Sequence, residues 1–218
     1  VNVEIGGSMR GQHVVECANY QPNVFEFIAP IAANALHSPW GIAFNETQRM
    51  AIDADSSWQT KSEEAGLEGM KAARAIAMHS YRSYEGYHIR QSEDNHDKFD
   101  SFKASSYQRY MGEKLSQRFN AFTYWYLSKA MDSHNVARTK GSMEKALEEI
   151  KAVTLSIALV GDLLFPPKEQ KFIADHVAKG YYFEVVSLFG HDGFLVEKES
   201  FEQIFRKFLA KDTQMLKK

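Results

Sequence analysis

VNVEIGGSMRGQ, residues 1–12, is the stretch that decides the fold, because it predicts a strand that turns sharply into a helix. Apolar Val1, Val3 and Ile5 alternate with polar residues, and this two-residue period is typical of a β-strand. From Met9 the chain can continue as a helix to about Tyr20. We therefore expect a strand, a tight turn and a helix in direct succession.

Ser8 lies at this turn, directly after Gly6 and Gly7. The order of residues is similar to a nucleophile elbow, in which a strained turn raises a serine hydroxyl above the edge of the sheet. The backbone N–H of Met9, at the helix N-terminus, is then expected in the oxyanion hole. The G-x-S-x-G pattern has glycine where this chain has Arg10, and we expect the larger side chain to crowd the turn. Taken alone, the stretch also fits an ordinary strand-to-helix turn.

The composition is typical of a globular protein without a strongly charged surface. Of the 218 residues, 44% are apolar and 25% are charged, and the formal net charge is −2. We therefore expect neither nucleic acid nor a membrane as a partner. The single cysteine, Cys17, excludes an internal disulfide and is expected to be a small core residue. Because no leader sequence is recognisable, we expect the chain in the cytoplasm.

The pattern of apolar residues divides the chain into three segments. Residues 1–32 hold the first strand and helix and a second predicted strand at 24–32. Residues 33–135 show helical spacing, with helices expected at 38–53, 66–84, 105–119 and 120–133 and a solvated polar loop at 91–100. Residues 136–218 alternate again, with helices expected at 142–150, 167–178 and 197–209 and strands at 154–160 and 182–188. The sequence thus predicts an α/β core, formed by 1–32 and 136–218, with a helical insertion at 33–135.

Two further polar residues follow predicted strands. Asp162 comes directly after the strand at 154–160, and His191 lies between two glycines after the last strand. Open α/β sheets place their sites at the carboxyl ends of their strands. Ser8, Asp162 and His191 therefore have the chain order of a hydrolase triad, in which the histidine takes the serine proton and the acid orients the imidazole. Singly, Asp162 can be a turn residue and His191 an ordinary surface or core histidine.

Several stretches of the sequence resemble a known protein family. The chain resembles the homoserine O-acetyltransferase family over essentially its whole length, through six phrases in the family's order and spacing: GGSMRGQ, SPWGIAFNETQRMAIDAD, GMKAARAIAMHSYRSYEGY, SSYQRYMGEKLSQRFNAFTYWYLSKAMDSHN, GDLLFPPKEQ and GHDGFLVE. The resemblance implies an α/β-hydrolase fold with an inserted helical cap. It further implies transfer of acetyl from acetyl-CoA, a co-substrate, to the hydroxyl of L-homoserine through an acyl-serine, in methionine biosynthesis.

The resemblance also implies roles for single residues. Ser8 would be the nucleophile, Asp162 the triad acid and His191 the base, while Arg74 and Asp192 would bind the substrate. No cofactor is bound in this family, and its members form homodimers through the cap helices. The resemblance begins at the nucleophile strand, so we expect a partial fold without the early strands and the second oxyanion donor. A complementary N-terminal segment is then an expected partner, because the nucleophile strand would otherwise expose an unpaired edge.

Three charged residues have alternative interpretations. Arg74 interrupts an otherwise apolar helix face, and a guanidinium there needs a carboxylate, either from a ligand or from an internal salt bridge. Asp192 can bind the ammonium group of an amino acid or hydrogen-bond its own loop. For Arg49 we favour a surface salt bridge over a contact with the phosphates of coenzyme A.

The sequence also bears on metal binding and on functions other than acyl transfer. We expect no metal site, because the histidines lack HExxH spacing and Phe99 occupies the glycine position of a calcium loop at 94–100. The same triad with water as the acceptor would make the chain an esterase. Arg10 and the missing early strands leave open an inactive remnant that acts only as an interaction piece.

Overall fold

The computed structural model describes residues 2–60 and 62–210, so Val1 of the first predicted strand lies outside the described residues. The chain divides into two compact units. The residues up to Ser38 and from His134 onward form the first unit, and Pro39–Ser133 form the second.

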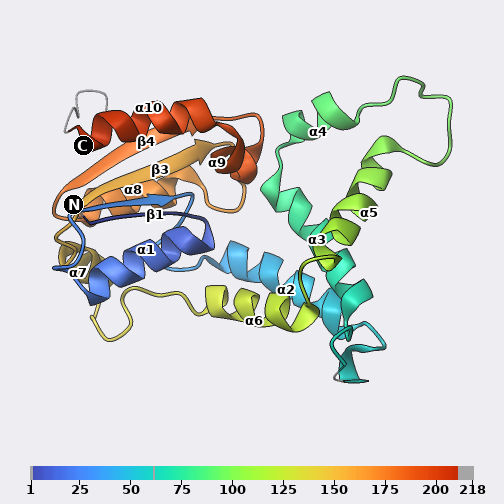
Figure 1. The fold of residues 1–218 in the computed structure, drawn as a ribbon, viewed down its shortest axis with the longest axis horizontal. Coiled ribbons are helices and arrows are strands. Elements are labelled where there is room, and N and C mark those ends of the chain that lie inside the picture. The colour runs from blue at the N-terminus through green and yellow to red at the C-terminus, as the bar shows by residue number, and fades with distance from the viewer. Residues whose placement is uncertain (1, 61, 211–218) are drawn as a thin grey trace. The chain divides into compact units, whose positions relative to one another are not determined.

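A four-stranded parallel sheet forms the centre of the first unit (Figure 1). Its order is β1 (Val3–Gly7), β2 (Phe27–Ile31), β3 (Val153–Val160) and β4 (Gly180–Val186). All four predicted strands are present, although β2 and β4 begin and end a few residues from the predicted limits. Since the strands are parallel, their carboxyl ends lie along one edge of the sheet.

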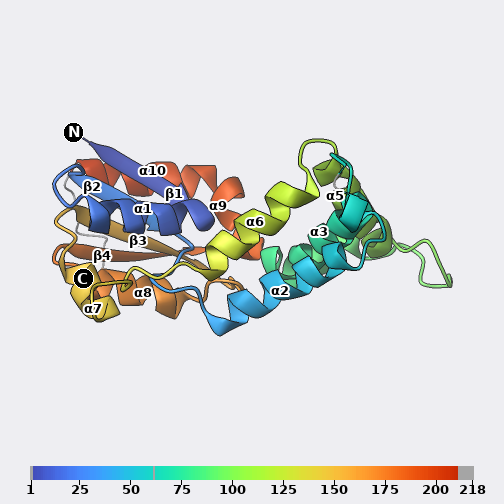
Figure 2. The same ribbon diagram turned by 90° about the horizontal axis from the view of Figure 1, so that it is seen from below.

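Helices cover both faces of this sheet (Figure 2). On one face lie α1 (Met9–Tyr20), α7 (Met143–Glu148) and α8 (Pro167–His176), packed against residues such as Ile28. On the other face lies α10 (Lys198–Leu209). Helix α10 contributes Phe201, Ile204 and Phe208, which share one side of the helix and are buried against the sheet.

Strand β3 shows why the sheet is buried on both faces. Leu155, Ile157 and Leu159 lie in the core under α10, whereas the intervening Ala158 packs with Ala174 of α8. A strand covered on both faces is mostly apolar, and β3 is apolar at every position except the buried Thr154 and Ser156. Between β4 and α10 the chain forms the short helices η2 (Gly190–Asp192) and α9 (Gly193–Val196).

The connections into and out of the inserted segment run side by side within the first unit. Leu36 and Asn135 form an isolated antiparallel bridge. The backbone N–H of His37 donates to the carbonyl of His134 at 3.1 Å, and that of Val136 donates to Ala35 at 3.0 Å. The chain therefore leaves the sheet unit and returns to it at neighbouring points.

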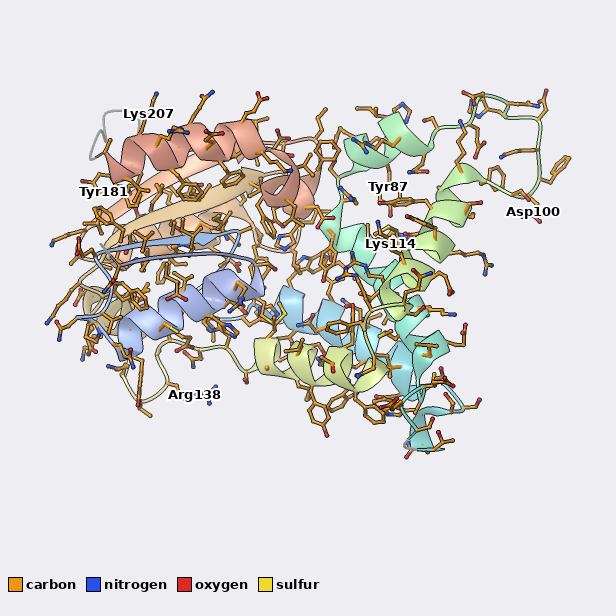
Figure 3. All side chains as sticks on the ribbon, viewed as in Figure 1. Tyr87, Asp100, Lys114, Arg138, Tyr181 and Lys207 are labelled. Atoms are coloured by element: carbon orange, nitrogen blue, oxygen red, sulfur yellow. The ribbon has the colours of Figure 1, made fainter. Side chains whose placement is uncertain are left out.

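The second unit is helical. Its elements are α2 (Pro39–Asp53), η1 (Trp58–Thr60), α3 (Leu67–Tyr81), α4 (Tyr84–Gln91), α5 (Lys103–Ser116) and α6 (Ala121–Asp132). A core of Ile52, Met70, Ala73, Leu115 and Ala121 joins α2, α3, α5 and α6. The four predicted helices are confirmed, and the loop predicted at 91–100 is largely exposed, with Asp100 extending away from α4 and α5 (Figure 3).

The prediction of one helix over 66–84 was wrong at its end. Arg82 has extended backbone angles (φ −116°, ψ 154°), so α3 stops there. Ser83 then caps a new helix, because its hydroxyl accepts a hydrogen bond from the backbone N–H of Gly86 at 3.0 Å. The apolar spacing continues across this break, which is why periodicity alone did not reveal α4.

Two other expectations about single residues were wrong, the first only in part. Arg49 does form the expected salt bridge, but not at the surface: its side chain is 2% exposed and bonds to Glu46, to Asp132 at 2.5 Å and to the Ser128 hydroxyl at 2.9 Å, which ties α2 to α6. Cys17 is exposed rather than part of the core. None of the helices formed by the described residues has the length and apolar character that a membrane crossing requires.

Candidate active site

Ser8 occupies a strained turn between β1 and α1. Its backbone angles are φ 57° and ψ −128°, and positive φ is unusual for a residue with a side chain. The Ser8 N–H donates to the carbonyl of Ile31, at the end of β2, at 2.9 Å. Strain of this kind persists only where the surrounding structure enforces it, and it is concentrated at functional sites.

Glycine is needed at two positions beside this serine. A Cβ on Gly6 would lie 2.5 Å from the carbonyl oxygen of Arg10, and one on Gly11 would lie 2.6 Å from the Cβ of Ala33. The close approaches therefore involve the backbone at position 10 but not its side chain. The expectation that Arg10 crowds the turn was wrong, because the Arg10 side chain is exposed.

Asp162 follows β3 and is fixed by its own loop. Gly161, with φ 90°, turns the chain just before it. The Asp162 Oδ1 atom accepts hydrogen bonds from the backbone N–H groups of Leu164 and Phe165, at 2.8 and 2.9 Å. The other oxygen, Oδ2, lies 2.7 Å from Nδ1 of His191. One carboxylate oxygen thus holds the loop while the other faces the imidazole.

His191 lies in η2, after β4, and its ring is buried. Its Nε2 atom lies 2.9 Å from Oγ of Ser8. The ring stacks on Phe165 at a centroid distance of 5.3 Å and meets Phe194 edge to face at 5.5 Å. In the neutral ring with Nδ1 donating to Asp162, Nε2 carries no proton and can accept the one on Ser8.

The structure thus brings together the three predicted triad residues at the carboxyl ends of β1, β3 and β4. Met9 is the first residue of α1, and the first N–H groups of a helix have no partner within the helix. Its N–H therefore belongs to a positive helix end beside Ser8. An arrangement with an oriented base, a hydroxyl and such a helix end suits acyl transfer through a serine ester.

Comparison with known proteins identifies relatives of the chain. No family model matches the chain. A homoserine O-acetyltransferase of Cyclobacterium marinum is 48% identical over 208 residues, which are 95% of this chain and 59% of the relative. One of Trichormus variabilis is 38% identical over 216 residues, covering 96% of this chain and 60% of the relative.

Over the span it shares with them, the chain belongs to the homoserine O-acetyltransferase family. The chain spans about three fifths of the length of these relatives. The resemblance stated from the sequence is therefore confirmed for the family.

Solved structures confirm the fold. The homoserine O-acetyltransferase of Bacillus anthracis has a TM-score of 0.85 at 20% identity, covering 95% of this chain and 59% of that one. The enzyme of Staphylococcus aureus has a TM-score of 0.76 at 27% identity, and esterase E22 has 0.82 at 21%. The chain therefore has part of an α/β-hydrolase fold.

Arg74 and Asp192, the two predicted substrate residues, lie in different units. Arg74, on α3, is partly buried, and its guanidinium lies over the ring of Tyr81 at 5.0 Å. No ion pair joins Arg74 to a carboxylate within residues 2–60 and 62–210. The internal salt bridge weighed as an alternative is thus not found there. Asp192 is the last residue of η2, next to His191, and is partly buried.

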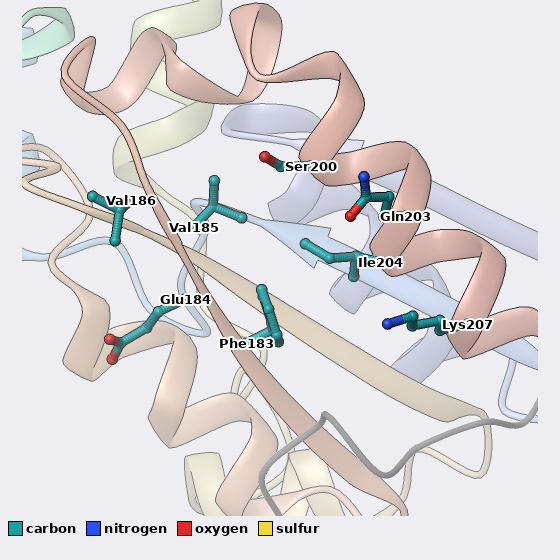
Figure 4. Close-up of a pocket in the computed structure, with 8 residues that line it drawn as sticks. All are labelled: Phe183, Glu184, Val185, Val186, Ser200, Gln203, Ile204 and Lys207. Carbon is teal, nitrogen blue, oxygen red and sulfur yellow. The ribbon is translucent and has the colours of Figure 1, made fainter.

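A cavity of about 300 Å³ lies between β4 and α10 (Figure 4). Phe183 and Val185 line it from the strand, and Ile204 and Lys207 line it from the helix. It includes none of the triad residues. Among the described residues, no group of three or more His, Cys, Asp or Glu side chains is arranged to hold a metal ion.

Some residues of the site had no signal in the sequence analysis. Phe165 and Phe194 enclose the imidazole, yet an isolated phenylalanine in a loop or short helix has no pattern that predicts such a contact. Buried Gln12 and Asn34 and partly buried Glu169 were also missed, since they meet only when distant segments fold together.

Proposed function

We propose that the chain carries the acyl-transfer centre of a homoserine O-acetyltransferase, which moves acetyl from acetyl-CoA to the hydroxyl of L-homoserine. The observation that supports this most is the contact of His191 Nε2 with Ser8 Oγ at 2.9 Å while Nδ1 faces Asp162 at 2.7 Å. The similarity to relatives named homoserine O-acetyltransferase supports acetyl as the transferred group and homoserine as the acceptor. In this proposal acetyl-CoA is a co-substrate, no cofactor is bound, and the pathway served is methionine biosynthesis.

The reaction has two half-reactions. In the first, Ser8 Oγ attacks the thioester carbonyl, His191 takes the hydroxyl proton, and the C–S bond breaks as that proton passes to the departing thiol. In the second, the homoserine hydroxyl attacks the acyl-serine, His191 takes its proton, and the proton returns to Oγ as the ester bond to Ser8 breaks. Asp162 stabilises the imidazolium in both, and the N–H of Met9 faces the oxyanion.

Arg74 and Asp192 are proposed to hold the acceptor. A guanidinium that is partly buried without a described carboxylate partner suits the carboxylate of an amino acid. Asp192 would take the ammonium group. Homoserine carries a carboxylate, an ammonium group and a free hydroxyl, so each of the two side chains has a counterpart of opposite charge on it.

The proposal includes partners. Strand β1 has no neighbour on its outer side among the described residues, and Val3 and Ile5 on it are exposed. The relatives have about two fifths of their length beyond the shared span. We therefore propose that a complementary N-terminal segment covers this edge and supplies the second oxyanion donor. A homodimer through the helices of residues 39–133 and a cytoplasmic location complete the proposal, with neither nucleic acid nor a membrane as a partner.

The test is the acetylation of Ser8 by acetyl-CoA. Intact-mass measurement should show the addition of one acetyl group to the 218-residue chain, or to its complex with a separately expressed N-terminal segment of a relative. The adduct should be absent in Ser8→Ala and should disappear when L-homoserine is added. No acetylation in either preparation would contradict the proposal and favour an inactive remnant.

A second candidate function is ester hydrolysis with the same triad. Esterase E22, whose fold matches with a TM-score of 0.82, is the observation that favours it. In that case the chain would hydrolyse simple esters, and L-homoserine would not change the rate at which the acetyl adduct on Ser8 is lost. Product analysis for O-acetylhomoserine against free acetate distinguishes the two functions.

A further inference from the structure

A hydrogen-bonded chain of three polar side chains, two of them buried, links α1 to α8. Gln12 and Asn34 are each 2% exposed. The amide nitrogen of Gln12 donates to Oδ1 of Asn34 at 2.9 Å, and the amide nitrogen of Asn34 donates to the carboxylate of Glu169 at 3.1 Å. Burying amide groups is costly unless they are hydrogen-bonded, so these three side chains depend on one another.

These side chains come from three segments that also carry the site. Gln12 lies on α1, one turn after Ser8, and its N–H donates to the Ser8 carbonyl at 3.1 Å. Asn34 lies in the connection after β2. Glu169 lies in the first turn of α8, directly after the acid loop that holds Asp162. A second bond, from the amide of Gln170 to the Ala33 carbonyl at 2.6 Å, ties the same two connections.

We propose that Glu169, acting through Asn34 and Gln12, is a positioning residue that holds the acid loop at 161–166 against the elbow helix. This inference rests on the proposed function. The carboxylate of Glu169 contacts none of the reacting atoms in the structure. Its effect is exerted through the placement of Asp162 and Ser8 on the two sides of His191.

The charges around Glu169 make this placement depend on pH. Burial raises the pKa of Glu169 to about 7, and the hydrogen bond from Asn34 opposes that rise. Lys168 on its own helix lowers the pKa, and Asp162 raises it. His37 accepts a hydrogen bond from the Gln12 amide. His134 contacts the Asn34 carbonyl oxygen through Nε2 at 2.8 Å and is paired with Glu16 through Nδ1. Below about pH 7 Glu169 is neutral, and its bond to Asn34 loses the strength that an ionised acceptor gives.

The test compares Glu169→Gln, Glu169→Ala and the wild-type chain. Ser8 is labelled with a fluorophosphonate, whose phosphorus–fluorine bond breaks as Oγ bonds to phosphorus, and the rate is measured from pH 5 to 9. We expect Glu169→Ala to label about ten- to a hundredfold more slowly. Glu169→Gln, which can still accept from Asn34, should recover much of the rate and lose the ionisation near pH 7. Asp175→Asn, which removes an exposed carboxylate from the same helix, is the control and should match the wild type.

A second measurement does not depend on the reactivity of Ser8. Hydrogen exchange of the Leu164 and Phe165 amides, which bond to Asp162, should be faster in Glu169→Ala than in the wild type at the same pH. Faster exchange with no labelling of the wild type would support the positioning role and contradict the proposed function. Unchanged exchange, or a Glu169→Gln pH profile that superimposes on that of the wild type, would overturn the inference.

Discussion

Replacing Asp162 by asparagine tests the candidate triad with almost no change in shape. The Asp162 Oδ1 atom accepts two backbone hydrogen bonds, from Leu164 and Phe165. Turning the new amide nitrogen toward those donors would leave both unpaired, at about 1–3 kcal/mol each. The amide nitrogen will therefore face His191, donate to Nδ1 and drive the ring proton to Nε2. That atom then donates to Ser8 instead of accepting its proton.

The expected result is a loss of about 10⁴ in the rate at which Ser8 is acylated, equal to about 5 kcal/mol in the barrier. Pre-steady-state mass spectrometry with acetyl-CoA, or with an activated ester, measures this rate. Asp175→Asn is the matched control, and the urea unfolding midpoint of each variant shows whether the fold is kept. A folded Asp162→Asn variant that is less than tenfold slower would refute the tautomer argument and the role of Asp162.

Three further changes give separate predictions. Gly6→Ala places a Cβ 2.5 Å from the Arg10 carbonyl oxygen, so urea unfolding should show a loss of about 1–3 kcal/mol, together with slower labelling of Ser8. Asp132→Asn removes a charge partner of buried Arg49 and should lower the free energy of unfolding by about 3 kcal/mol. An exposed ion pair contributes only about 0–1 kcal/mol, so a loss below about 0.5 kcal/mol would contradict this prediction. Glu169 has a folded pKa of about 7 against an ordinary 4.5, so the folded state binds the extra proton. The free energy of unfolding should therefore fall by about 2 kcal/mol as pH rises from 4.5 to 7, a figure reduced for the partial exposure of Glu169. In Glu169→Gln this dependence on pH should disappear.

The strands and the order of the site residues were predictable from the sequence. Alternating or continuous apolar runs mark β1 and β3, and the parallel arrangement then places Ser8 and Asp162 at one edge. His191 followed from its position after the last strand. These predictions depend only on local patterns and on the rule that parallel strands end on the same side.

The rest depended on tertiary contacts that no local pattern contains. Gln12 and Asn34 are 22 residues apart in the sequence, and Asn34 and Glu169 are 135 apart, so their hydrogen bonds have no periodic signal. Arg49 was misjudged because a charged residue on a helix usually reaches solvent, whereas α6 covers it here. At Arg10 the sequence pattern suggested a side-chain clash, but the turn requires only close backbone approach.

The bridge between Leu36 and Asn135 has a consequence for how this chain can vary. Because the chain leaves and re-enters the sheet unit at neighbouring points, the two ends of the inserted segment are held together without the inserted helices, and β2 pairs directly with β3. A lineage can therefore lengthen, shorten or exchange residues 39–133 without rebuilding the serine, histidine and aspartate. A new inserted segment would then require recombination at only two adjoining positions of the chain.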